Sequence, residues 1–309
     1  MKGFIFPGQG SQYKGMGKVI LSKYEEGYDY LKEAQKILNM DLEYLLFEAD
    51  DEVLKDTENA QITILLTSYI HFKYLEKNGL KPDYVAGNSL GEYSALLCAN
   101  SLSFEDTLIL IRERARTMKK FIGNIKGVQV AILNLKLDDI EEIISNLQEK
   151  GIIQISGYNS KTQIVLSLEE NLLEDLKNLV SEKKGRLIPL KTSLPFHSPL
   201  MKKSEDEFSK VLTNFNFLNP KFGYISSVTN QELSDGNLIK EVLLNQITRP
   251  VRWIQTIMKM EELGVKNFYE VGPNKVLTNL GSRDFNNLIF LNSESLLEDK
   301  ETWKNLKMH

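Results

Sequence analysis

The 309-residue chain is poor in the residues that bind metals or form cross-links. It contains a single cysteine, Cys98, and only three histidines. One cysteine excludes an intramolecular disulfide and a cysteine-based zinc cluster. Three histidines make a histidine-rich metal site unexpected. We therefore expect no metal centre.

The chain also lacks a basic excess and a long hydrophobic run. Its net charge is −4 and its pI is near 5.7, whereas nucleic-acid-binding proteins are usually basic, so we expect no nucleic-acid partner. The apolar residues 3–6 are interrupted by Pro7 and Gly8, which leaves too short a stretch for a signal-peptide core. No run approaches the roughly 20 apolar residues of a membrane span. These features favour a cytoplasmic protein without a membrane partner.

Ser89 stands between Gly87 and Gly91, where a predicted strand (residues 84–86) is followed by a predicted helix (residues 91–98). This Gly-x-Ser-x-Gly pattern is typical of a nucleophile elbow, in which glycines relieve the crowding of a sharp turn. The elbow would expose the Ser89 hydroxyl and point the N–H of Leu90 toward a developing oxyanion. A chance match among 19 glycines is the alternative, and the flanking strand and helix favour the catalytic interpretation.

A glycine-rich loop, residues 7–12, follows a predicted first strand at residues 3–6. Two phosphate-binding motifs do not match this loop. A dinucleotide fingerprint requires glycine at position 13, which is Tyr13, and a Walker A loop requires lysine at position 16, which is Met16. The sequence leaves two possibilities. The loop either binds ligand at the end of the strand and donates a second N–H to an oxyanion, or it is an ordinary strand-to-helix turn.

Amphipathic periodicity predicts helices at residues 24–38 and 62–77, and a third helix at residues 104–118 with Ser103 as its N-cap. The third helix carries three arginines at alternate positions, and successive members point about 200° apart. They cannot share one face, so at least one must point inward. The three are Arg112, Arg114 and Arg116.

The composition changes at residues 123–127, and a βαββαβ pattern follows that is typical of a ferredoxin-like fold. Its strands are predicted at residues 128–133, 152–158, 163–168 and 186–190, and its helices at residues 137–149 and 171–184. We expect an α/β protein in which a ferredoxin-like small lobe, residues 124–190, is inserted into a large α/β-hydrolase-like lobe with a mostly parallel sheet, residues 1–123 and 191–309. The large lobe continues with a strand at residues 222–228 and helices at residues 238–247 and 250–262. Residues 267–274 resemble a last strand that runs into a turn.

A serine nucleophile needs a neighbouring base, which is usually histidine. His71 lies in a predicted helix before the serine, and His309 is the last residue. His197 follows the serine in chain order, as in α/β-hydrolases, on a loop fixed by prolines at both sides. By elimination the base is His197, with a structural loop histidine as the alternative. No acidic partner stands out, so a dyad and a triad both remain open.

Seven stretches of the chain match one family in order and spacing. They are residues 6–12 (FPGQGSQ), 87–92 (GNSLGE), Arg114 ahead of Met118, residues 159–160 (NS), 195–198 (PFHS), Gln246 before residues 250–251 (PV), and residues 270–273 (EVGP). Each stretch alone is weak, but the set is highly specific. Over essentially its whole length the chain resembles malonyl-CoA:acyl carrier protein transacylases and the acyltransferase domains of polyketide synthases.

The resemblance implies ping-pong transfer of malonyl from malonyl-CoA to the phosphopantetheine thiol of an acyl carrier protein, with no tightly bound cofactor. Ser89 would be the nucleophile and His197 its base. The remaining roles that the resemblance implies are backbone oxyanion donors at Gln9 and Leu90, a guanidinium for the malonyl carboxylate at Arg114, and a main-chain carbonyl that orients the imidazole at Gln246.

Two residues depart from the family pattern. Asn88 replaces the usual histidine before the nucleophile and cannot become cationic, which bears on how tightly the carboxylate is held. Ala115 follows Arg114 where glycine is common. Because carrier proteins are generally acidic, a basic patch near the cleft is also expected, with Lys202 and Lys203 as its candidates.

Two other functions fit the same residues. One is a hydrolase that removes acyl groups from carrier proteins, and the other is a non-catalytic carrier-protein-binding module. Arg114 argues against a hydrolase of simple acyl chains, because a buried cation without a carboxylate partner is costly. The sequence leaves fatty-acid and polyketide synthesis both open.

Overall fold

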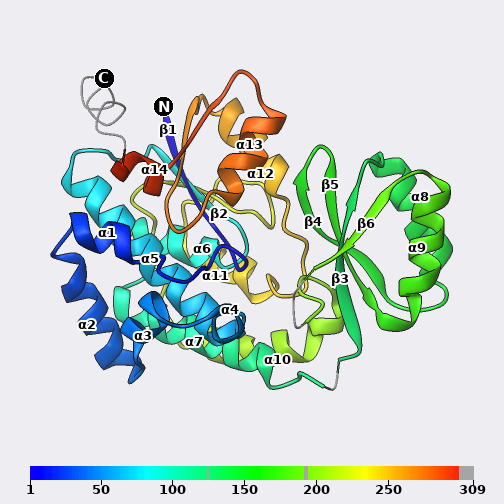
Figure 1. The fold of residues 1–309 in the computed structure, drawn as a ribbon, viewed down its shortest axis with the longest axis horizontal. Coiled ribbons are helices and arrows are strands. Elements are labelled where there is room, and N and C mark those ends of the chain that lie inside the picture. Colours follow the sequence, from blue (N-terminus) through cyan, green and yellow to red (C-terminus); the bar gives the residue numbers. More distant parts are fainter. Residues whose placement is uncertain (124, 191–193, 299–309) are drawn as a thin grey trace.

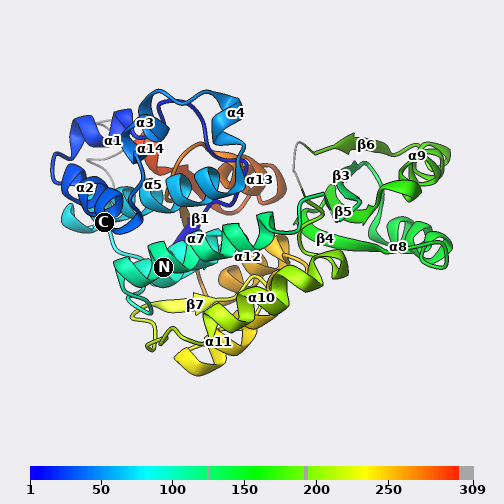
Figure 2. The ribbon, with the colours of Figure 1, turned by 90° about the horizontal axis from the view of Figure 1, so that it is seen from below.

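The computed structural model describes residues 1–123, 125–190 and 194–298, in two lobes that lie side by side (Figures 1 and 2). The large lobe contains a five-stranded sheet, and the small lobe contains a four-stranded sheet. The lysines of residues 300–307 and His309 lie outside the described residues, as do Thr192 and Ser193 at the start of the histidine loop.

The five strands of the large sheet follow the order β7-β2-β1-β8-β9, and every neighbouring pair is parallel. The expected mostly parallel sheet is therefore confirmed. Its strands are β1 (Lys2–Phe6), β2 (Tyr84–Gly87), β7 (Gly223–Ile225), β8 (Asn267–Glu270) and β9 (Ile289–Asn292).

Helices bury both faces of this sheet. Phe4 and Phe6 of β1 belong to one hydrophobic core, whereas Ile5 between them belongs to a second core. Alternate side chains of a strand point to opposite faces, so β1 is covered on both sides, as parallel strands usually are. The second core is covered by α12 (Trp253–Glu262) and α13 (Val276–Asp284). The first is covered by α1 (Lys18–Lys23), α2 (Gly27–Leu38), α3 (Leu42–Phe47), α4 (Asp51–Leu54), α5 (Thr57–Lys77), α6 (Gly91–Cys98), α7 (Phe104–Lys119), α10 (Lys202–Leu212), α11 (Gly236–Leu244) and α14 (Ser293–Glu298).

The small lobe has the predicted βαββαβ order and its own hydrophobic core. Its strands follow the order β4-β5-β3-β6, and all neighbouring pairs are antiparallel, which confirms the ferredoxin-like prediction. The elements are β3 (Gly127–Leu133), α8 (Leu137–Leu147), β4 (Ile153–Ser160), β5 (Gln163–Glu169), η1 (Glu170–Leu172), α9 (Leu173–Glu182) and β6 (Arg186–Pro189). Strand β4 contacts the large lobe, where the N–H of Tyr158 donates to the carbonyl of Val251 at 2.8 Å.

Several predicted boundaries were wrong for local reasons. The chain at residues 24–38 forms α2 only from Gly27, after the separate short helix α1. The helix predicted from residue 250 begins at Trp253, because Val251 pairs with Gly157 of β4. Strand β7 ends at Ile225, because the N–H of Ser227 donates to Glu92 at 2.8 Å instead of to a neighbouring strand.

The helix predicted at residues 238–247 is α11, which begins at Gly236 and ends at Leu244. Its start is fixed by Asp235, whose side chain accepts from the N–H groups of Asn237 and Leu238. Among the described residues, no helix combines the length and the apolar character that a membrane crossing requires.

Candidate active site

Ser89 lies on a sharp turn at the carboxyl end of β2, directly before α6. Its φ of 53° is in the left-handed region, which is strained for a residue with a side chain. A Cβ on Gly87 would lie 1.9 Å from the carbonyl carbon of Gly91, and a Cβ on Gly91 would lie 2.1 Å from the carbonyl oxygen of Phe6. Both positions therefore need glycine, and the turn has the predicted elbow geometry.

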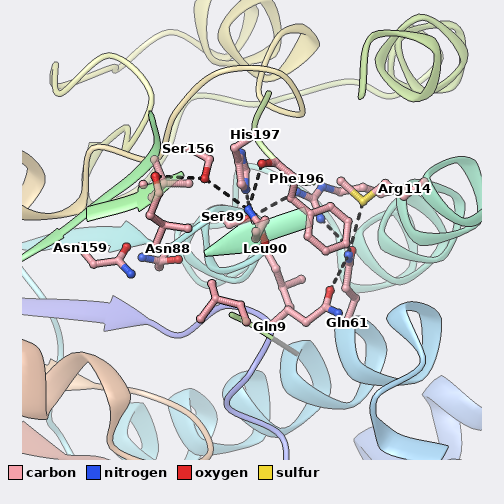
Figure 3. Close-up of a pocket in the computed structure, with 16 residues that line it drawn as sticks. Gln9, Gln61, Asn88, Ser89, Leu90, Arg114, Ser156, Asn159, Phe196 and His197 are labelled. Carbon is pink, nitrogen blue, oxygen red and sulfur yellow. Dashed lines mark hydrogen bonds between the residues drawn. The ribbon is translucent and has the colours of Figure 1, made fainter. Parts of the chain in front are cut away.

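The side chain of His197 contacts the Ser89 hydroxyl. Its Nε2 lies 2.7 Å from Ser89 Oγ, and Figure 3 shows Ser89 between His197 and the side chains of Gln9 and Gln61. The other ring nitrogen, Nδ1, lies 3.0 Å from the carbonyl oxygens of both Gln246 and Arg249. Carbonyls only accept hydrogen bonds, so Nδ1 carries the proton and Nε2 is free to accept from the serine hydroxyl.

The imidazole is held in its neutral form. Burial and, after it, the positive charge of Arg114 lower the pKa of His197 to about 4, whereas the bonds to the carbonyls of Gln246 and Arg249 act in the opposite direction. A base must be unprotonated to accept a proton, so His197 is ready to act at neutral pH.

The backbone of His197 is also strained, with a φ of 57°, and the small lobe holds it in place. Gln154 of β4 donates from Nε2 to the carbonyl of His197 at 3.1 Å. The preceding carbonyl, that of Phe196, accepts from Gln129 Nε2 at 3.0 Å and from Ser167 Oγ at 2.7 Å. Three side chains of the ferredoxin-like sheet therefore fix the two peptides around the histidine.

Arg114 is the one arginine of α7 that points inward. Its side chain is 1% exposed, whereas those of Arg112 and Arg116 are 19% and 50% exposed. Arg114 Nη1 donates to Gln61 Oε1 at 2.8 Å, and Nη2 lies 3.1 Å from Gln246 Oε1.

The guanidinium of Arg114 reaches the serine, since Nη2 lies 3.4 Å from Ser89 Oγ. Within the described residues it forms no ion pair, and its Nε has no hydrogen-bond partner. A buried charge of this kind fits an anionic group on a ligand.

A cavity of about 150 Å³ opens between the two lobes at Ser89. Within the part of the chain that the structure describes, the N–H groups of Gln9 and Leu90 donate to no protein acceptor. The residues that line the cavity are Gln9, Gln61, Asn88, Ser89, Leu90, Arg114, Met118, Gln129, Ser156, Gly157, Asn159, Val165, Leu190, Phe196, His197 and Val251.

Sequence reasoning did not single out Gln61, Gln129, Gln154 or the carbonyl of Arg249. Gln61 gave one usable signal in the sequence, because it is a polar amide next to the apolar residues of a long helix; in the structure it is 1% exposed. The other three have no local signature.

The two lysines predicted to form a basic patch differ in the structure. Both lysines are exposed, but Lys202 Nζ lies 2.8 Å from Glu205 and 3.0 Å from Asp206, whereas Lys203 forms no ion pair with the described residues. Their role in binding a carrier protein remains a prediction. No cluster of three or more histidine, cysteine or acidic side chains suited to a metal ion occurs among the described residues.

The fold and this site together define a class of protein. A parallel sheet covered by helices, with an elbow serine bonded to a histidine at its carboxyl edge, is typical of α/β-hydrolase-like serine enzymes.

Comparisons with known proteins identify the family within this class. The sequence matches the model of the acyl transferase domain over residues 3–298. It is 37% identical over 279 residues to malonyl CoA-acyl carrier protein transacylase of Bacillus subtilis (strain 168), covering 90% of this chain and 88% of the relative. The chain therefore belongs to the acyl transferase family and, within it, to the malonyl CoA-acyl carrier protein transacylases.

Solved structures agree with this assignment. The malonyl CoA-acyl carrier protein transacylase of Clostridium perfringens Atcc 13124 superimposes with a TM-score of 0.94 at 34% identity, over 99% of this chain and 97% of the other. A second structure contains a type II PKS acyl-carrier protein in complex with its malonyl-transacylase. It superimposes with a TM-score of 0.92 at 29% identity, over 96% of this chain and 98% of the other.

Proposed function

We propose that the protein transfers the malonyl group of malonyl-CoA to the phosphopantetheine thiol of an acyl carrier protein, through a malonyl ester on Ser89. The observation that carries this proposal is the 2.7 Å contact between Ser89 Oγ and His197 Nε2 beside the buried Arg114, which forms no ion pair with any described residue. The names of the relatives and the solved complex with a carrier protein support the same substrates.

Each half of the reaction uses His197 once as a base and once as an acid. Ser89 Oγ attacks the thioester carbonyl while its proton passes to His197 Nε2, and the oxyanion accepts hydrogen bonds from the N–H groups of Gln9 and Leu90. Coenzyme A leaves as the thiol after taking that proton. The carrier-protein thiol then gives its proton to His197, attacks the ester and releases Ser89.

Gln246 and Arg114 support these steps in different ways. The Gln246 carbonyl, with that of Arg249, keeps the proton on Nδ1 and takes the place of a triad acid. Arg114 binds the free malonyl carboxylate through a two-pronged contact that lysine cannot make. Among the described residues that line the cavity, Arg114 is the only arginine or lysine, so Asn88 leaves the carboxylate to this one guanidinium.

The hydrolase alternative uses the same ester, with water in place of the thiol. A hydrolase of simple acyl chains has no use for Arg114, and we therefore favour malonyl transfer. We further propose that residues 1–123 and 191–309 form the large lobe and residues 124–190 the small lobe. We place the enzyme in the cytoplasm, where coenzyme A thioesters are used, in fatty-acid or polyketide synthesis.

A transfer assay tests the proposal. Malonyl-CoA and a phosphopantetheinylated carrier protein should give malonyl-carrier protein with the natural enzyme. Ser89→Ala should give none, and His197→Ala should be slower by a factor of about 1,000 or more. Transfer that survives in Ser89→Ala at the natural rate would rule out the serine ester.

A further inference from the structure

Two opposite charges are buried near the nucleophile without touching each other. Arg114 is 1% exposed, and Glu92, in the first turn of α6, is 0% exposed. Within the described residues neither side chain forms an ion pair. Two buried charges without partners are expensive, so something between them must compensate.

The side-chain amide of Gln246 lies between these two charges. Its Oε1 accepts from Arg114 Nη2 at 3.1 Å, and its Nε2 donates to Glu92 Oε2 at 2.5 Å and to the carbonyl of Ser89 at 2.9 Å. A flipped amide would place an NH₂ group against the guanidinium and an oxygen against the carboxylate. The amide orientation is therefore fixed by the chemistry of its neighbours.

The surroundings of Glu92 fit the ionised carboxylate. Its Oε1 accepts from Tyr224 Oη at 2.8 Å, from Ser226 Oγ at 3.1 Å and from the N–H of Ser227 at 2.8 Å. Burial raises the pKa of Glu92, and these donors, with Gln246, oppose that rise. All four neighbouring groups, those of Tyr224, Ser226, Ser227 and Gln246, can donate, and an ionised carboxylate accepts from all of them at once.

We propose that Glu92 is a positioning residue that sets the preference for a carboxylate-bearing acyl group, acting on Arg114 through the Gln246 amide. The Glu92 carboxylate supplies the countercharge for the Arg114 guanidinium, and the Gln246 amide group separates the two. A direct ion pair would occupy the guanidinium, whereas the bridged arrangement keeps it charged, fixed and open toward Ser89. The inference rests on the proposed malonyl transfer.

The test compares malonyl-CoA with acetyl-CoA in the acylation of Ser89. Glu92→Gln keeps the shape of the side chain and removes its charge, so the countercharge for Arg114 is lost. We expect the ratio of kcat/KM for malonyl-CoA to that for acetyl-CoA to fall at least about tenfold, mainly through a higher KM for malonyl-CoA. Tyr224→Phe removes one hydrogen bond to the same carboxylate without removing its charge, and its ratio should stay within about twofold of the natural value.

A second variant tests the route through the amide. Gln246→Met removes the bridge and retains the backbone carbonyl, so the same ratio should fall. The double variant should fall no further than the larger single effect, because both changes break one connection. If E92Q does not fold, the ratio measured for Gln246→Met alone tests the inference.

Three results would overturn the inference. These are an unchanged ratio in E92Q, an equal loss with both acyl groups, and an unchanged ratio in Gln246→Met. Failure of the underlying function would look different, because the natural enzyme itself would then form no malonyl ester.

Discussion

Ser89 Oγ and His197 Nε2 lie 2.7 Å apart although 108 positions separate them in the chain, and both residues have left-handed backbones. Such a conformation costs a side-chain-bearing residue about 1 kcal/mol or more, so other contacts must maintain it. The elbow glycines maintain it at Ser89. At His197 the neighbouring carbonyls are bonded by side chains of the small lobe. The reactive pair therefore depends on both lobes.

Gln154→Leu should slow catalysis without weakening substrate binding. The change removes the donors to the carbonyls of His197 and Thr248 and leaves the cavity lining unchanged. We expect kcat to fall by roughly tenfold, with KM for malonyl-CoA within about twofold. Gln148→Leu, the same change on an exposed position of that lobe, is the matched control. Equal kinetics in the two variants would show that Gln154 has no positioning role.

Arg114→Ala should lose malonyl loading and gain activity on acetyl or longer acyl groups. A charge-assisted, two-pronged contact is worth up to about 3 kcal/mol, so malonyl acylation should fall by roughly 100-fold. Arg114→Lys should not restore it, because an ammonium cannot make both contacts. Arg116→Ala, a change of an arginine on the exposed side of the same helix, should have little effect. Malonyl loading at the natural rate in Arg114→Ala would contradict the assigned role.

The acylation rate should be insensitive to mild acid. The pKa of His197 is lowered to about 4, so the imidazole stays neutral and able to accept a proton from pH 8 down to about 5. Stopped-flow acylation of Ser89 would measure this profile. In Arg114→Ala the acid limb should move to higher pH, because a positive charge that disfavours protonation has been removed. An acid limb near 6.5 in the natural enzyme would disagree with this account.

His71 should make the fold sensitive to acid. Burial lowers its pKa to about 3, and neither ring nitrogen has a hydrogen-bond partner among the described residues. The unfolded chain takes up this proton below about pH 6.5 and the folded protein does not, so stability is present above that pH and is lost as the pH falls toward 3.

Urea unfolding at pH 7, 6 and 5 checks this. Below pH 6 the unfolding free energy of the natural protein should fall with each pH unit. In His71→Leu this fall should be smaller by roughly 1 kcal/mol per pH unit. His197 contributes equally in both proteins, so the difference isolates His71. A slope that is the same in both proteins would assign the acid sensitivity to other groups.

Much of the fold could be predicted because its signals are local. The glycines at 87 and 91, the alternating pattern of the small lobe and the Ser103 cap each act within a few residues. In the structure the Ser103 hydroxyl accepts from the N–H of Asp106 at 3.0 Å, as expected for an N-cap. The burial of one arginine in α7 followed from the geometry of a helix alone.

The rest depends on packing between distant segments. The bond of Gln154 to the histidine loop joins the two lobes, and the Arg249 carbonyl is a backbone group that every residue has. Strand β7 is shorter than predicted because the N–H of Ser227 donates to the buried carboxylate of Glu92. The residues next to these positions in the sequence do not predict these contacts.

The central claim is that Ser89 carries the malonyl group between donor and acceptor. Intact-protein mass spectrometry, followed by peptide mapping after a brief incubation with malonyl-CoA, tests it most directly. The account predicts one malonyl adduct on the peptide containing Ser89, which disappears when a carrier protein with its phosphopantetheine thiol is added. An unmodified Ser89 in an enzyme that still transfers malonyl would contradict it.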